Sequence, residues 1–172
     1  TGARCIERDL NRAWTPAGVR SAIDAHAHGS ADAEDTELVE LKQAIDDAIA
    51  NAGSGDVTLL DLHTTSATSM PFVAVEDRVK SRRLASSLRV TAVFGIEALL
   101  SGLLISYALP NAQAALVFEA GRHDAPESPA RHAAAIRITL AQLGMIPDGA
   151  ADASRALLHR ACAGTPRMLE SR

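Results

Sequence analysis

Two short apolar segments constrain the fold of this chain more than any other feature. Residues 57–62 read VTLLDL and residues 114–118 read AALVF, and polar or loop-forming residues flank both. A short apolar run with such boundaries is typical of a strand buried within a sheet. We therefore predict a strand in each place, the first in a parallel pairing, and a further strand over residues 89–94.

Segments with helical periodicity alternate with these strands. Over residues 33–52, apolar side chains recur at spacings of three and four, acidic residues crowd the first turns, and Gly53 follows as a stop signal. Further helices are expected over residues 76–87, 128–143 and 150–163. Residues 1–29, which contain Pro16, Gly18 and Gly29, are expected to be irregular.

The helix expected after residue 127 carries two specific predictions. Ser128 followed by Pro129 has the form of an N-cap and a proline in the first turn. The apolar face of this helix is expected to consist of Ala133, Ile136, Leu140 and Leu143.

Strands that alternate with helices predict an α/β fold. We expect a three-layer sandwich, in which helices flank a mostly parallel or mixed sheet. The chain has 172 residues, enough for one domain with its own core. Aromatic residues make up only 3% of the chain, so Ala, Leu, Val and Ile are expected to form that core.

Charge and composition exclude some classes of partner. The net charge is -4 and no basic run occurs, so we expect no nucleic-acid partner. Residues 90–109 are largely apolar, but Glu97, Gly95 and Gly102 interrupt them. A charge at bilayer centre is costly, so this segment is interpreted as a strand followed by a core helix, with no membrane span. Cys5 and Cys162 lack metal-ligand spacing and are expected to be reduced thiols in a cytoplasmic protein.

His63 is the first candidate for a chemical role. It follows directly on the VTLLDL segment, and a Thr/Ser-rich loop comes after it. Ligands collect at the carboxyl ends of strands in open α/β sheets, and imidazole is a common zinc ligand. Asp61, two residues earlier on the same strand face, could orient the imidazole. The alternative, which spacing alone favours, is a histidine that only caps the strand end by hydrogen bonds.

Glu119 occupies a similar position at the end of the AALVF segment, before Ala120 and Gly121. A carboxylate there is costly to bury unless it is paired, ligating or hydrated. General acid–base chemistry is one use for it, and a salt bridge at the strand end is the alternative.

Other polar residues are less specific. Arg4, Asn11 and Arg12 offer donors for a carboxylate or an oxyanion, although such a pattern also occurs in a solvated basic loop. His26 and His28 are interpreted as part of a polar surface loop. A Ser-His-Asp triad is excluded because no G-x-S-x-G elbow is present.

Three motifs occur together in a fixed order. They are R-x-I-x-x-D-L-N-R at residues 4–12, D-L-H-T-T at residues 61–65 and E-A-G at residues 119–121. This combination resembles the succinylglutamate desuccinylase/aspartoacylase family, whose members are similar in fold to zinc carboxypeptidases. The tail EAGRHDAPESPARH is similar to a bacterial subgroup of uncertain substrate.

The resemblance implies a zinc-dependent amide hydrolase and a role for each residue. His63 would bind zinc, and Glu119 would be the general base. Arg4 would stabilise the oxyanion, while Asn11 and Arg12 would hold a carboxylate of a small-molecule amide substrate. Asp9 would orient the loop.

The chain departs from the family pattern at one point. Family members supply two zinc ligands from an H-x-x-E motif upstream of D-L-N-R, and no H-x-x-E occurs in this sequence. Residues 1–172 are therefore interpreted as a single but partial catalytic domain, which alone would hold zinc weakly. The alternative is a non-catalytic α/β module that binds a small anion or a partner subunit. The sequence leaves open whether the protein is a monomer or a homo-oligomer.

Overall fold

The computed structural model describes residues 5–53, 55–96, 100–165 and 168–170 of the chain. The chain divides into two compact units, of which the first comprises Thr1–Val57 and Leu100–Ala112. The second comprises Thr58–Leu99 and Gln113–Arg172. All the strands that the structure describes belong to the second unit.

The first unit is helical. It contains the short 3-10 helix η1 (Leu10–Arg12) and the helices α1 (Pro16–Ala27), α2 (Ala33–Ala52) and α5 (Leu104–Ala108). Its buried cluster is formed by Trp14, Val19, Ala22 and Leu38. The ring centroid of Trp14 lies 5.1 Å from that of Tyr107.

The helix α1 contradicts the expectation that residues 1–29 are irregular. The Thr15 hydroxyl accepts a hydrogen bond from the Gly18 amide at 3.0 Å, and Pro16 opens the helix. A hydroxyl cap followed by proline is a start signal, and it outweighs the weak helix propensity of Gly18. Gly18 is required here, because a Cβ would lie 2.3 Å from the Ala13 carbonyl oxygen.

The helix α2 confirms its prediction at both ends. The Asp32 carboxylate accepts a hydrogen bond from the Asp35 amide at 2.6 Å and caps the first turn. Gly53 ends the helix with a φ of 56°, a conformation that glycine adopts without steric cost.

The second unit contains a five-stranded mixed sheet in the order β1-β4-β2-β3-β5. The strands are β1 (Thr58–Thr65), β2 (Phe72–Val75), β3 (Thr91–Phe94), β4 (Ala114–Arg122) and β5 (Met168–Glu170). All neighbouring pairs are parallel except β2 with β4. The three predicted strands are confirmed, and the first is parallel to its neighbour. The short strands β2 and β5 were not expected.

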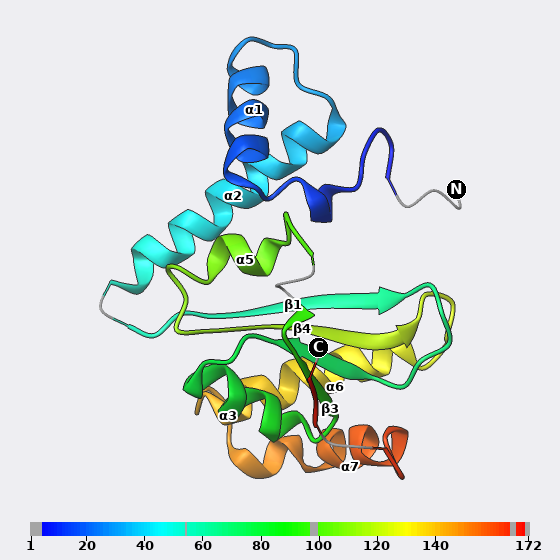
Figure 1. Ribbon diagram of the computed structural model, residues 1–172. Coiled ribbons are helices and arrows are strands. Elements are labelled where there is room, and N and C mark those ends of the chain that lie inside the picture. Colours follow the sequence, from blue (N-terminus) through cyan, green and yellow to red (C-terminus); the bar gives the residue numbers. More distant parts are fainter. Residues whose placement is uncertain (1–4, 54, 97–99, 166–167, 171–172) are drawn as a thin grey trace. The chain divides into compact units, whose positions relative to one another are not determined.

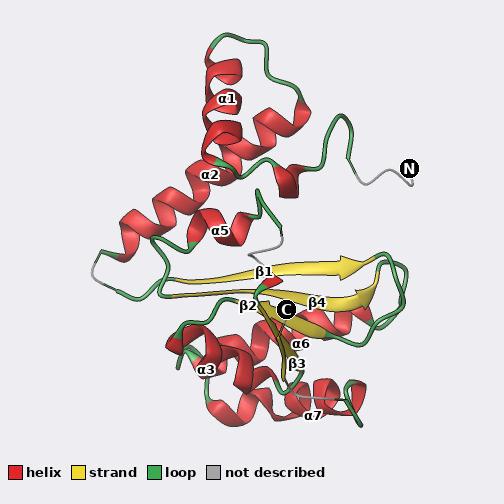
Figure 2. Cartoon of the chain, in the orientation of Figure 1, coloured by secondary structure: helices red, strands yellow, loops and turns green. Residues whose placement is uncertain are grey.

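Three helices lie on one face of this sheet, as Figure 1 shows. They are α3 (Val79–Leu88), α6 (Ser128–Gln142) and α7 (Asp152–Ala161), and the 3-10 helix η2 (Asp148–Ala151) precedes α7. Figure 2 distinguishes these helices from the strands by colour. The core between the sheet and these helices contains Val73, Leu88, Leu116, Phe118, Ile138 and Leu158. The predicted α/β fold, with a mixed sheet flanked by helices, is confirmed.

The apolar face predicted for α6 is wrong. The buried residues include Ala134, Ala135, Ile138 and Ala141. Ile136 and Leu143 are 40% and 44% exposed. Small side chains let the helix backbone approach the sheet closely, so the alanine-rich face packs inward although its neighbouring face carries larger apolar groups.

The apolar segment 90–109 contains β3 and the short helix α5, in agreement with the expected strand and helix. Glu97, which argued against a membrane span, lies outside the described residues. Among the helices that the structure describes, none combines the length and apolar character needed to cross a membrane. Cys5 and Cys162 are both free thiols, as expected, and burial raises the pKa of the Cys162 thiol.

Candidate functional site

The strands β1 and β4 bring His63 and Glu119 together. The two residues are register partners in the parallel ladder, so their side chains leave the sheet on the same face. Phe118 points to the opposite face, where it is fully buried in the core formed with α6. His63 and Glu119 therefore lie side by side on the sheet face that is turned away from that core.

Both residues lie inside their strands, whereas the sequence predicted that they would follow or end them. The strand β1 continues through Thr64 and Thr65, and β4 continues to Arg122. Threonine is β-branched and favours extended backbone, which accounts for the longer β1. A position inside a strand suits a site residue better than a loop position, because the hydrogen bonds of the sheet hold the residue in place.

Asp61 contacts His63 as the sequence predicted. The Asp61 Oδ1 and His63 Nε2 atoms are 3.1 Å apart, and the two side chains are 13% and 25% exposed. A carboxylate that accepts the Nε2 proton presents Nδ1 as the lone-pair nitrogen of the ring. Carboxylate–histidine pairs of this kind hold many metal-binding histidines in orientation.

Glu119 is half-buried, and its Oε2 atom is buried. Phe72, on the antiparallel neighbour β2, is its register partner on the other side. An ionised carboxylate in such surroundings is costly unless it is paired, ligating or hydrated, so this position allows both a chemical use and the salt bridge that the sequence left open.

A β-bulge lies directly beyond His63 and Glu119. The step from His63 to Thr65 on β1 is matched by the longer step from Glu119 to Arg122 on β4. Bulges of this kind often occur next to active sites, where they redirect side chains. Gly121 has a φ of 110°, and a Cβ on it would lie 2.8 Å from Nη1 of Arg131. This requirement explains the glycine of the E-A-G motif.

Three residues at the start of α6 contact this bulge, and the sequence gave no sign of them as a group. The Ser128 hydroxyl donates to the Arg122 carbonyl at 3.1 Å. Arg131 Nη1 donates to the Ala120 carbonyl at 2.9 Å, and His132 Nε2 to the His63 carbonyl at 2.9 Å. Ser128 is therefore not the N-cap that was predicted. The cap position belongs to Glu127, which makes no side-chain capping bond.

The other predicted site residues belong to the first unit. Asp9 caps η1 through its side chain, which accepts from the Asn11 amide at 3.1 Å. Asn11 Oδ1 accepts from the Leu104 amide at 3.3 Å. The exposed Arg12 donates to the Asn11 carbonyl at 2.6 Å. Arg4 lies outside the described residues.

The described residues fit only part of a zinc site. His63, with Asp61 behind it, has the environment of one ligand. No group of three or more His, Cys, Asp or Glu side chains in the described part of the chain could hold a metal ion. A catalytic zinc needs three protein ligands, so these residues do not form such a site by themselves. His26 and His28 are exposed at the end of α1.

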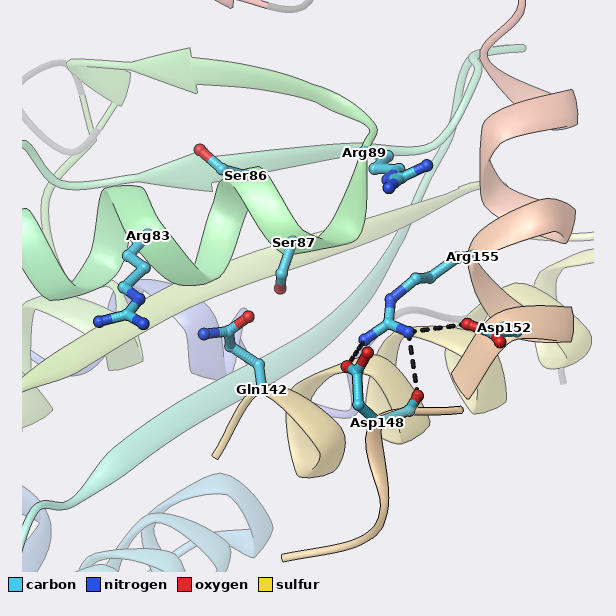
Figure 3. Close-up of a pocket in the computed structure, with 8 residues that line it drawn as sticks. All are labelled: Arg83, Ser86, Ser87, Arg89, Gln142, Asp148, Asp152 and Arg155. Atoms are coloured by element: carbon cyan, nitrogen blue, oxygen red, sulfur yellow. Dashed lines mark hydrogen bonds and ion pairs between the residues drawn. The ribbon is translucent and has the colours of Figure 1, made fainter. Parts of the chain in front are cut away.

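Two of the pockets in the described residues open on the second unit. One, of about 360 Å³, lies between the segments that follow His63 and Glu119 and is lined in part by Ser69, Arg122 and Arg131. The other, of about 480 Å³, is shown in Figure 3 and lies at the end of α3. There Arg155 is fixed by Asp148 and Asp152.

Comparison with known proteins finds one matching family model and several solved structures of similar fold. The family model for the succinylglutamate desuccinylase/aspartoacylase catalytic domain matches residues 1–140. No curated protein gives a significant match. Among solved structures, succinylglutamate desuccinylase from Chromobacterium violaceum is 15% identical over 98% of this chain, with a TM-score of 0.55. The enzyme of the same name from Vibrio cholerae is 21% identical over 99% of the chain, with a TM-score of 0.53.

A third structure is the ectoine utilization protein EutE (DoeB) from Ruegeria pomeroyi. It is 15% identical over 83% of this chain, with a TM-score of 0.50, and 43% of its own length is covered. The chain spans 50% and 47% of the two desuccinylases, which is about half of each. At these identities the likeness shows the shared fold.

Proposed function

The chain belongs to the succinylglutamate desuccinylase/aspartoacylase family, and we propose that it forms part of a zinc-dependent enzyme that hydrolyses an amide bond. The substrate would be an N-acyl amino acid or a similar carboxylated amide. Residues 1–172 would contribute one part of the catalytic domain. The observation that carries the proposal is the pairing of His63 with Glu119 in adjacent strands.

His63 would supply one ligand to zinc. Its contact with Asp61 would hold the ring in one orientation, with the other ring nitrogen facing the metal. When bound, zinc lowers the pKa of a coordinated water to about 7.

Glu119 would act as the general base. Its carboxylate would accept a proton from the attacking water and return it to the nitrogen of the amine as the C–N bond breaks. The products are a carboxylic acid and a free amine. The half-buried position of Glu119 suits this role, because the carboxylate is partly shielded from bulk water.

The N-terminal residues would bind the substrate. Asn11 and Arg12 would hold its carboxylate, and Arg12 has a planar guanidinium that can match a carboxylate with two parallel bonds. Asp9 supports this arrangement by capping the turn that contains both residues. Arg4 would stabilise the oxyanion that develops at the scissile carbonyl. We also propose a cytoplasmic location, since both thiols are free.

The full-length protein tests the proposal against the alternative of a non-catalytic binding module. Zinc content would be measured by elemental analysis, and amine release would be followed with a set of N-acyl amino acids. We expect stoichiometric zinc and hydrolysis that a chelator abolishes and added zinc restores. A protein without zinc and without hydrolysis, but with saturable binding of a small carboxylate, would favour the binding module.

A further inference from the structure

The first turn of α6 lies where the two site-bearing strands lose their regular pairing. At a β-bulge one residue is left outside the ladder, and its backbone groups need other partners. The bulge beyond His63 and Glu119 is of this kind. Backbone carbonyl groups at this place therefore depend on donors from elsewhere in the fold.

Three side chains of α6 supply those donors. His132 binds the carbonyl of His63 in β1, and Arg131 binds the carbonyl of Ala120 in β4. Ser128 binds the carbonyl of Arg122 at the end of the bulge. The start of α6 thus contacts β1 at the proposed ligand His63 and contacts β4 at Ala120, next to the proposed base Glu119.

Two of the three donors, His132 and Arg131, have further packing contacts. The His132 ring packs edge-on against Phe118, with centroids 6.0 Å apart, and Phe118 is fully buried. The Arg131 guanidinium lies against Gly121, where only a glycine leaves room for it. Donors that are fixed by packing keep the strand ends fixed in turn.

We propose that Ser128, Arg131 and His132 form a clamp that positions His63 and Glu119 for the reaction. The inference rests on the proposed function, since it concerns the same two residues. The clamp residues act only through the backbone of β1 and β4, so they are positioning residues. Their contribution is to keep the imidazole and the carboxylate at the spacing that the ladder sets.

His123, in the segment between β4 and α6, makes two further contacts that support the clamp. His123 follows the bulge directly, and its amide donates to the Thr65 carbonyl at 2.9 Å. Its Nδ1 atom lies 2.7 Å from the Thr64 hydroxyl. The two residues after His63 are therefore also tied to the segment that leads into α6.

The test compares removal of a donor with its conservative replacement in the full-length protein. His132→Leu removes the donor to the His63 carbonyl, whereas His132→Gln keeps an N–H that can reach it. Arg131→Met removes the donor to Ala120. Arg137→Met is the matched control, because Arg137 lies in the same helix and is exposed.

We expect His132→Leu and Arg131→Met to lower kcat by roughly 10–100-fold, the range for residues that orient metal ligands. KM should change by less than about twofold, because no substrate contact is removed. His132→Gln should recover most of kcat, and Arg137→Met should match the wild type. Amide exchange over residues 62–65 and 119–122 should be faster in His132→Leu and restored in His132→Gln.

Two results would overturn the clamp. One is unchanged exchange and unchanged kcat in His132→Leu, while His63→Ala abolishes turnover. The other is a loss of kcat that follows the melting temperature alike in the Leu and Gln variants, which would indicate a purely structural role. Full turnover in both His63→Ala and Glu119→Gln would instead defeat the proposed function, and the clamp would lose its purpose with it.

Discussion

His63 and Glu119 are held by partners from distant parts of the sequence, whereas Arg12 is held by its own neighbour. His63 accepts a hydrogen bond from a residue 69 positions away, and its strand pairs with β4. The Arg12 guanidinium donates a hydrogen bond to the carbonyl of Asn11, the residue before it. The first pair is therefore fixed before any ligand arrives, while the guanidinium keeps donors for a ligand.

This difference suits two kinds of task. Groups that move protons or bind metal need fixed spacing. A residue that binds a substrate carboxylate needs exposure and unused donors. Substitutions in the two regions should consequently have different effects. Those near His63 and Glu119 should change the geometry of the site and the stability of the fold, whereas those at Arg12 should change the recognition of the substrate.

The largest effect is expected from the core behind the strands. Phe118→Ala should lower the free energy of unfolding by about 3–5 kcal/mol, because a fully buried ring is replaced by a cavity. Ile136→Ala on the exposed face of α6 is the control and should cost less than about 1 kcal/mol. Urea unfolding measures both. Equal costs would mean that Phe118 does not anchor β4.

The next effect concerns Arg12. Arg12→Lys should raise the activation free energy derived from kcat/KM for a carboxylated amide by about 1.5–3 kcal/mol, because lysine keeps the charge but loses one of the two parallel hydrogen bonds to the carboxylate. An uncharged amide of the same shape should be affected far less. The measurement is kcat/KM for both substrates in the wild type and in Arg12→Lys. If both substrates lose equally and the melting temperature falls, Arg12 is structural and the two regions do not differ as described.

A smaller effect is expected at the bulge. Gly121→Ala should cost about 1–3 kcal/mol of stability, because alanine at this φ is strained and its Cβ would meet Arg131 and the Ser69 carbonyl. Gly144→Ala is the control, since that glycine also has a positive φ but no atom within 4 Å of the added Cβ. Thermal unfolding of both variants measures the difference. A cost at Gly121 no larger than at Gly144 would show that the contact with Arg131 is loose.

The smallest effect lies in the first unit and depends on pH. Hydrogen bonds from Lys42 and Tyr107 lower the pKa of the Asp46 carboxyl. Because the pKa is lower in the folded state, the stabilisation is present above the unfolded value of about 3.9 and is lost as the pH falls through the folded value. Asp46 is 38% exposed, so Asp46→Asn should cost only about 0.5 kcal/mol at pH 7. Urea unfolding at pH 7 and at successively lower pH should show that cost shrinking once the pH falls below about 3.9.

Much of the scaffold could be predicted because its signals are local. The bounds of α2 follow from its periodicity and from Gly53, and the strands β1 and β4 follow from their apolar runs. The helix α1 was missed although Thr15 followed by Pro16 repeats the Ser-Pro pattern from which the start of α6 was predicted. The prediction of the buried face of α6 was wrong because the close packing of the helix against the sheet selects the smaller side chains. A single sequence does not reveal that packing distance.

The site was predictable only in part for the same reason. Asp61 and His63 lie two apart in one strand, so their contact follows from strand geometry. The pairing of His63 with Glu119 depends on which strands become neighbours. The contacts of Arg131 and His132 depend on where a bulge places two carbonyl groups, which residue spacing does not reveal.

The central claim is that His63 binds metal and Glu119 moves protons. It is tested most directly by measuring zinc content and single-turnover rates in the full-length protein for His63→Ala and Glu119→Gln. His63→Ala should lose zinc. Glu119→Gln should keep zinc and lose turnover by roughly 10²–10⁴-fold, the usual contribution of a general base. Turnover near the wild-type rate in Glu119→Gln, or full zinc occupancy in His63→Ala, would contradict the claim.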